Sequence, residues 1–178
     1  IVLDYRSNGG GVMGEAIDIA SLFVDQNERI VSIMGRDSSS LRHFATEHKP
    51  IARDIPIVVL VNGSSASASE ILAGALQDMD RAVVMGQRTY GKGLVQSTAH
   101  VGYNSYLKYT SEKYYIPSGR CIQAHDYSTR NNDGSVAVVP DSLISEFKTR
   151  GGRKIYDGGG IVPDVKLEPK YFSRFAIT

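Results

Sequence analysis

A continuous apolar run from Ile55 to Val61 constrains the fold most, because a turn of small and polar residues (62–65) follows it at once. An uninterrupted run of this length is typical of a strand that is buried on both faces. A helix follows the turn and places one stripe of apolar side chains at Ile71, Leu72, Ala75, Leu76 and Met79. Residues 81–85 then form a second short apolar segment. This strand–turn–helix–strand order predicts an α/β fold with a largely parallel buried sheet.

Further elements are predicted around this unit. Residues 1–5 and 29–34 have the composition of strands, and residues 94–123 alternate with the period of two that favours antiparallel or edge strands. Helices are predicted at three places, over 12–24, over the polar surface segment 38–48 and, as a short one, over 140–147. A surface loop is predicted over 126–135, and a turn at 163–164 is followed by a short strand.

Length and charge narrow the class of protein. The 178 residues contain no repeat or low-complexity linker, which favours one domain. Twenty Lys and Arg residues against 19 Asp and Glu residues give a net charge of +1, so no basic excess indicates a nucleic-acid or membrane-surface partner. Cys121 is the single cysteine, which excludes an internal disulfide. The histidines stand in no zinc-binding pattern, so neither a metal nor another cofactor is expected.

Residues 9–14 match the G-x-G-x-x-G pattern of dinucleotide-binding proteins, and Asp37 lies 23 residues after Gly14, near the place of a ribose-binding acid. The match is poor because Asp4 lies inside the strand and three polar residues separate that strand from the first glycine. A dinucleotide site is therefore disfavoured. Two other interpretations stay open, a turn that only connects strand to helix and a turn whose N–H groups face a site.

Residues 86–93 resemble a phosphate-binding P-loop but end in Gly where Ser or Thr should hold magnesium. A strand pattern follows them, whereas a P-loop opens a helix whose N-terminus holds phosphate. Phosphate binding is thus disfavoured here too. Lys92 lies between two glycines in this stretch, and the stretch alone favours an exposed lysine in a turn.

A third motif occupies the turn before the central helix. Ser67 and Glu70 fit a capping box, which explains one serine and one glutamate but not why small residues fill the whole turn. Small residues let another chain approach the backbone, and a helix N-terminus favours a developing negative charge. A serine nucleophile is therefore a candidate, although the G-x-S-x-G motif of the hydrolase elbow is absent.

A serine nucleophile needs a base. The four histidines (His43, His48, His100 and His125) stand in neither glycine-framed nor apolar surroundings. Lys92 is the better candidate, because its flanking glycines and valines are suited to bury it. A lysine acts as a base only when neutral, so an ordinary pKa of about 10.4 must fall by ~3 units. Gln96 is close in sequence and uncharged, which suits a group that orients a neutral amine.

Four motifs occur in the order found in the carboxyl-terminal processing peptidases, also called tail-specific proteases. They are L-D-Y-R-S-N-G-G-G (3–11), S-A-S-A-S-E-I (65–71), Y-G-K-G-L-V-Q (90–96) and Y-I-P-S-G-R-C-I-Q (115–123). The closing Y-D-G-G-G-I-V-P-D (156–164) also resembles the end of this family's sequence pattern. The resemblance spans nearly the whole chain.

The resemblance implies a crotonase-like α/β core with a mainly parallel buried sheet, flanking helices and additional strands. It also implies a serine–lysine dyad assisted by glutamine, with Ser67 as the nucleophile, Lys92 as the base and Gln96 as the orienting group.

For the oxyanion hole, the resemblance implies the N–H of Ala68 and an N–H of the glycine turn, from Gly10 or Gly11. Gly9 stands where the family usually has proline, which leaves the choice of glycine open.

The function that follows by resemblance is that of a serine endopeptidase that cleaves near the C-terminal tails of protein substrates, without a cofactor. Such proteases commonly act outside the bacterial cytoplasm or in the chloroplast lumen. Residues 1–178 are expected to be a catalytic core cut from a longer protein, without the PDZ-like module that usually precedes it. An inactive peptide-binding or scaffold domain is the alternative.

Overall fold

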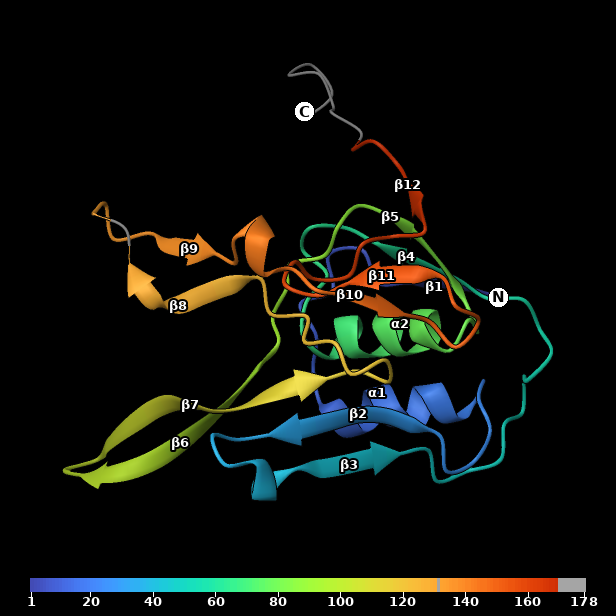
Figure 1. Cartoon of the computed structure of the whole chain (residues 1–178). Helices are drawn as coiled ribbons and strands as arrows, with labels where there is room; N and C mark the ends of the chain where they lie inside the picture. The colour runs from blue at the N-terminus through green and yellow to red at the C-terminus, as the bar shows by residue number, and fades with distance from the viewer. Residues whose placement is uncertain (131, 170–178) are drawn as a thin grey trace, which may run out of the picture.

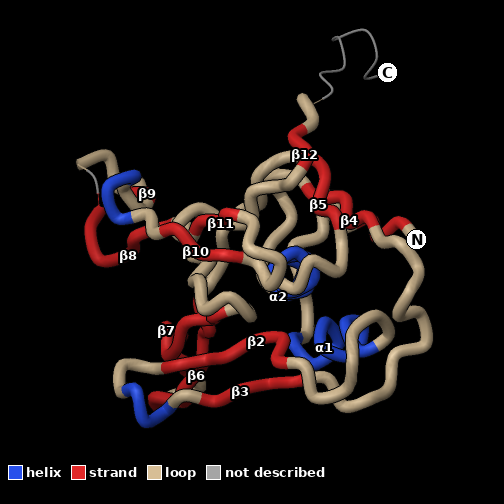
Figure 2. Tube along the Cα trace, turned by 45° about the vertical axis from the view of Figure 1, so that its right-hand side comes forward, coloured by secondary structure: helices blue, strands red, loops and turns tan. Residues whose placement is uncertain are grey.

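The computed structural model describes residues 1–130 and 132–169, which form three layers (Figure 1). A parallel sheet and an antiparallel sheet enclose two helices, α1 (Met13–Ser21) and α2 (Ala68–Asp78), and the turned view in Figure 2 shows the same order. The parallel sheet has the order β1–β4–β5–β12 and contains β1 (Val2–Asp4), β4 (Val58–Val61), β5 (Val83–Gly86) and β12 (Val165–Lys166). The predicted α/β fold with a parallel core sheet is therefore confirmed.

The core lies around α2, of which every residue is buried. The strand before it differs from the prediction. Ile57, Val59 and Val61 are buried, but Val58 and Leu60 between them are only partly buried. The apolar run thus has one fully covered face, the one that packs on the helices, rather than two.

The antiparallel sheet has the order β3–β2–β7–β6 and contains β2 (Arg29–Met34), β3 (Arg42–Ala45), β6 (Leu94–Gly102) and β7 (Ser105–Tyr115). The β6–β7 hairpin projects far from the core (Figure 1). It confirms the predicted antiparallel strands over 94–115, but residues 116–123, which the prediction also included, form no strand. The helix predicted over 38–48 is wrong. One 3-10 turn, η1 (Ser38–Ser40), precedes β3, which pairs with β2 and so gains cross-strand contacts that a local pattern does not reveal.

Short elements complete the described chain. They are β8 (His125–Arg130), β9 (Val136–Val138), η2 (Asp141–Leu143), β10 (Glu146–Lys148) and β11 (Lys154–Tyr156). The loop predicted over 126–135 is wrong in its first half, which is strand β8, and the helix predicted over 140–147 is a single 3-10 turn followed by β10. The predicted strand after 163–164 is confirmed as β12.

A buried ion pair fixes the motif 115–123 against α2. The Arg120 side chain is fully buried and donates to the Asp78 carboxylate (2.9 Å), to the Gln77 side-chain oxygen (2.8 Å) and to the Tyr156 carbonyl (3.0 Å). These bonds join the C-terminal half of α2 to β11 and thereby hold the segment that ends at Gln123.

Among residues 1–130 and 132–169, no helix has both the length and the apolar character that crossing a bilayer requires. The same residues contain no group of three or more His, Cys, Asp or Glu side chains suited to hold a metal ion.

Candidate active site

Three loops meet at one edge of the parallel sheet. The glycine turn (residues 8–11) follows β1, the serine turn (residues 62–67) follows β4, and the lysine loop (residues 87–93) follows β5. These strands are neighbours and parallel, with Leu60 paired to Asp4 on one side and to Met85 on the other. Parallel strands end at the same edge, where open α/β sheets bind their ligands. The structure thus brings together the three segments that the sequence motifs single out.

Ser67 has a strained backbone at the N-terminus of α2. Its φ of 58° and ψ of −120° lie in a region that residues other than glycine rarely adopt. Such strain costs on the order of 1–3 kcal/mol and persists only where the surroundings enforce it. A strained serine between a strand and a helix is the arrangement of the nucleophile elbow, although the sequence lacks the G-x-S-x-G motif.

Glu70 joins the serine turn to the lysine loop. Its side chain is fully buried, and one carboxylate oxygen accepts hydrogen bonds from the Thr89 hydroxyl (2.5 Å) and the Gly91 N–H (2.7 Å). The other oxygen accepts the N–H of Ser67 (2.9 Å) and the N–H of Lys92 (2.9 Å). Burial raises the pKa of Glu70, and the hydrogen bonds oppose that rise. One carboxylate therefore fixes the backbones of Ser67 and Lys92 relative to each other.

The contacts of Glu70 also test two predictions from the sequence, the capping box and the phosphate-binding loop. The predicted capping box of Ser67 and Glu70 is present, but no pattern in the sequence predicts the second role of Glu70, which is to hold the lysine loop. The N–H groups of Gly91 and Lys92 bind this carboxylate, so they do not form the phosphate cradle that residues 86–93 resemble.

The closing motif 156–164 packs against the lysine loop. The Thr89 hydroxyl accepts the N–H of Ile161 at 2.7 Å. Gly160 has a φ of 71°, and a Cβ added there would lie 2.8 Å from the Thr89 carbonyl oxygen and 3.0 Å from the Gly91 nitrogen. The glycine thus permits a close approach that positions Thr89 under Glu70, a role that only the packing reveals.

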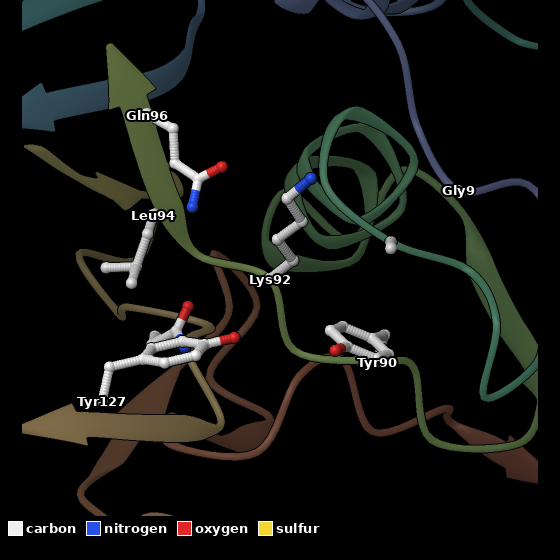
Figure 3. A pocket seen from close by; sticks show the side chains of 8 residues that line it. Gly9, Tyr90, Lys92, Leu94, Gln96 and Tyr127 are labelled. Carbon is white, nitrogen blue, oxygen red and sulfur yellow. The ribbon is translucent and has the colours of Figure 1, made fainter. Parts of the chain in front are cut away.

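Lys92 and Gln96 line one pocket of about 270 Å³, which we call the site pocket (Figure 3). Figure 3 shows both side chains projecting into it, Lys92 from the loop before β6 and Gln96 from β6 itself. Both residues are exposed, so the predicted burial of Lys92 is wrong. Its flanking glycines pack against residues 123–124 and 160, which buries the loop backbone but leaves the lysine side chain open.

Ser67 lies between two cavities. Its neighbour Ala66 lines the site pocket, and its neighbour Ala68 lines a cavity of about 240 Å³ together with Gly10 and Gly11. The four predicted groups Ser67, Lys92, Ala68 and the glycine turn are therefore brought to one place, with Gln96 on the far wall of the site pocket.

The glycine turn touches the serine turn directly. The Asn8 carbonyl accepts the Ala66 N–H at 3.0 Å, and the Asn8 side chain accepts the Gly10 N–H at 2.9 Å. The Gly10 N–H is thus engaged within its own turn. The Ala68 N–H belongs to the first turn of α2, whose N–H groups have no acceptor inside the helix.

Replacing Gly10 with alanine is expected to lower kcat/KM for the peptide cleavage that the sequence predicts by about 10- to 100-fold, because small misplacements of reacting groups carry such costs. Gly10 has a φ of +93°, and a Cβ would lie 2.6 Å from the Ala66 oxygen and 2.8 Å from the Ser67 Cβ. Gly14→Ala in α1 is the matched control, since its Cβ would meet open space and alanine favours a helix. Equal activity of the two variants would contradict the expectation.

The alternative candidates lie elsewhere or are otherwise engaged. The Asp37 carboxylate accepts the Ser39 N–H at 2.9 Å and caps η1, which is a local role rather than that of a ribose-binding acid. No histidine lines the site pocket within the described residues. His43 instead bonds Ser32 across β2 and β3 (2.7 Å), and the ring of His125 lies 5.1 Å from that of Tyr90.

Comparison with known proteins identifies the family. A family model described as peptidase family S41 matches residues 1–129, which include all three loops of the site. The chain belongs to peptidase family S41. The predicted resemblance to carboxyl-terminal processing peptidases is thereby confirmed.

Individual relatives agree with this S41 assignment. The chain is 39% identical over 145 residues to a carboxy-terminal-processing protease of Bartonella bacilliformis, covering 82% of the chain and 31% of the relative. It is 42% identical over 167 residues to a probable CtpA-like serine protease of Staphylococcus aureus, covering 93% and 30%. Among solved structures, the photosystem II D1 C-terminal processing protease matches with a TM-score of 0.69 and 32% identity, covering 95% and 34%. The chain thus spans about a third of the length of these relatives.

Proposed function

We propose that this S41 chain carries the catalytic centre of a serine endopeptidase of the carboxyl-terminal processing type, on a crotonase-like fold. The observation that carries the proposal is the buried carboxylate of Glu70, which binds the N–H of Ser67 and that of Lys92 at 2.9 Å each. This contact couples a strained serine at a helix N-terminus to a lysine that faces an open pocket. Catalysis further requires the Lys92 amine to come within hydrogen-bond reach of the Ser67 hydroxyl.

In the proposed mechanism, the Ser67 hydroxyl attacks the scissile carbonyl while the neutral amine of Lys92 takes its proton. The Lys92 ammonium then returns a proton to the leaving amine, and water hydrolyses the acyl-enzyme by the same route. Gln96 orients the lysine from β6. The N–H groups of Ala68 and Gly11 stabilise the oxyanion, with Gly11 preferred because the Gly10 N–H is bonded to Asn8.

The proposed substrates are the C-terminal tails of proteins, held in extended form. Strand β6 is an edge strand of the antiparallel sheet. Its outer edge therefore offers backbone N–H and C=O groups with which an extended peptide can pair. The proposed place of action is outside the cytoplasm, in line with the family resemblance.

A second candidate function is peptide binding without turnover. The exposure of Lys92 favours it, because the side chain lacks the burial that the sequence predicts for a lysine base. In the proposed enzyme, the substrate that fills the site pocket covers this amine and excludes water from it.

A fluorophosphonate probe distinguishes the two functions. We expect the probe to label the chain covalently, and we expect Ser67→Ala to abolish both labelling and the cleavage of tail peptides. Ser65→Ala and Ser69→Ala are the neighbouring controls. Because the buried Ser65 hydroxyl donates to the Tyr5 carbonyl (2.7 Å), the folding of the Ser65→Ala variant is checked by circular dichroism. Labelling that persists in Ser67→Ala would contradict the assignment. Tail peptides that bind without labelling or turnover would favour the inactive domain.

A further inference from the structure

A second cavity adjoins the site pocket. Its volume is about 500 Å³, compared with about 270 Å³ for the site pocket. Leu94, Gln123 and Tyr127 line both cavities, so the two are adjacent. Figure 3 shows Leu94 and Tyr127 on the side of the site pocket that Gln96 also occupies. Anything held at Lys92 therefore lies next to the second cavity, which we call the side cavity.

Two projecting parts of the molecule form the walls of the side cavity. The β6–β7 hairpin supplies one wall, and the segment from β8 to η2 supplies the other, which Figure 1 shows on the same side of the molecule. Apolar side chains from both walls and from the 115–123 motif face the space, namely Leu94, Cys121, Tyr127, Val139, Pro140 and Leu143. Leu143 is 68% exposed, which leaves most of its apolar surface without a partner in the described chain.

Two polar groups of the lining are already bonded within the protein. The Gln123 side chain accepts the Gly93 N–H (2.7 Å) and donates to the His125 carbonyl (2.8 Å), so both ends of its amide are engaged. The Asp157 carboxylate accepts the Ser145 N–H at 2.7 Å. The other titratable side chains of the lining belong to Lys113, Asp126 and His125, and together they have no single dominant sign of charge. The surface left for a ligand is thus mainly apolar.

We infer that the side cavity is a subsite that accepts one large apolar side chain of the substrate, leucine- or phenylalanine-like, while the scissile bond lies at Ser67. The inference rests on the proposed function. The volume falls in the range of roughly 300–1,000 Å³ that is usual for ligand pockets, which are mostly apolar with few polar groups. The occupant is the substrate itself because the cavity shares three lining residues with the pocket that holds Lys92 and Gln96.

The test uses a series of alanine-rich peptides with a free carboxyl end, in which a single Phe is moved from position to position. Binding is measured by fluorescence anisotropy on Ser67→Ala, and kcat/KM is measured on the chain with Ser67. At one position Phe is expected to improve binding and kcat/KM over Ala by about 10- to 100-fold. Leu143→Trp, which places a bulkier side chain in the cavity, is expected to reduce that gain to about twofold or less when the Phe peptide and the all-alanine peptide are compared on the same variant.

Leu107→Trp is the matched control, because Leu107 is 54% exposed on β7 and lines none of the cavities described above. It should keep the full gain from Phe. An unchanged gain in Leu143→Trp, no favoured Phe position, or a preference for Lys or Glu over Phe would overturn the subsite. A Phe gain in binding that Leu143→Trp abolishes, together with no hydrolysis by any form, would instead refute the proposed function and leave the subsite in place.

Discussion

Replacing Glu70 with alanine is expected to remove most of the activity together with a large part of the stability. The change leaves four donors without their acceptor, namely the Thr89 hydroxyl and the N–H groups of Ser67, Gly91 and Lys92. Each unsatisfied buried donor costs about 1–3 kcal/mol, less whatever water or relaxation recovers. We therefore expect a loss of about 3–5 kcal/mol from a domain whose total stability is of the order of 5–15 kcal/mol.

The activity should fall further than the loss of folded protein explains. Without the carboxylate, the Ser67 N–H loses the acceptor that helps to hold its strained backbone, and the direct link between the N–H groups of Ser67 and Lys92 is lost. Urea unfolding gives the change in stability, and the rate of fluorophosphonate labelling per folded molecule gives the change in site geometry. We expect that rate to fall by at least about 100-fold.

Glu70→Gln provides a graded variant, because its single amide oxygen can accept from only one of the two pairs of donors. It should be intermediate in both measurements. Glu47→Gln, at an exposed glutamate, is the matched control and should change stability by less than about 0.5 kcal/mol. A folded Glu70→Gln that labels at the unmodified rate would show that this carboxylate does not position the serine.

The sequence predicts the site in outline because its main parts are local. The apolar run at 55–61, the small-residue turn and the helix after Ser67 form one contiguous βαβ unit, so periodicity and turn chemistry suffice to place them. The glycine turn and the lysine loop follow neighbouring strands of the same sheet, and parallel strands necessarily end at one edge. The meeting of these loops is thus a consequence of the predicted fold class.

The parts that the sequence analysis missed depend on contacts between distant segments. Strand β3 exists because Phe44 and its neighbours pair with β2, which outweighs the polar composition that suggests a helix. The exposure of Lys92 depends on which side of the loop residues 123–124 and 160 cover. Gln123 and Thr89 have no local pattern that reveals their hydrogen bonds, although Gln123 lies inside a motif of the family resemblance.

Lys92→Met is expected to abolish most of the peptide cleavage while leaving the fold intact. Methionine keeps an unbranched apolar stem but removes the amine that takes the proton of Ser67, and general-base catalysis contributes about 10²- to 10⁴-fold in rate. The Lys92 side chain is exposed, and its N–H bond to Glu70 comes from the backbone, so the substitution should change stability by less than about 0.5 kcal/mol. Steady-state cleavage of a tail peptide and thermal unfolding measure the two effects.

Variants of Lys108 and Gln96 serve as controls for the Lys92→Met prediction. Lys108→Met removes an exposed lysine of β7 and should leave the rate unchanged. Gln96→Glu should be more harmful than Gln96→Ala, because a carboxylate beside the lysine favours its protonated form, which cannot accept a proton. The opposite order of the two Gln96 variants, or full activity in Lys92→Met, would remove the lysine from the mechanism and require another base for Ser67.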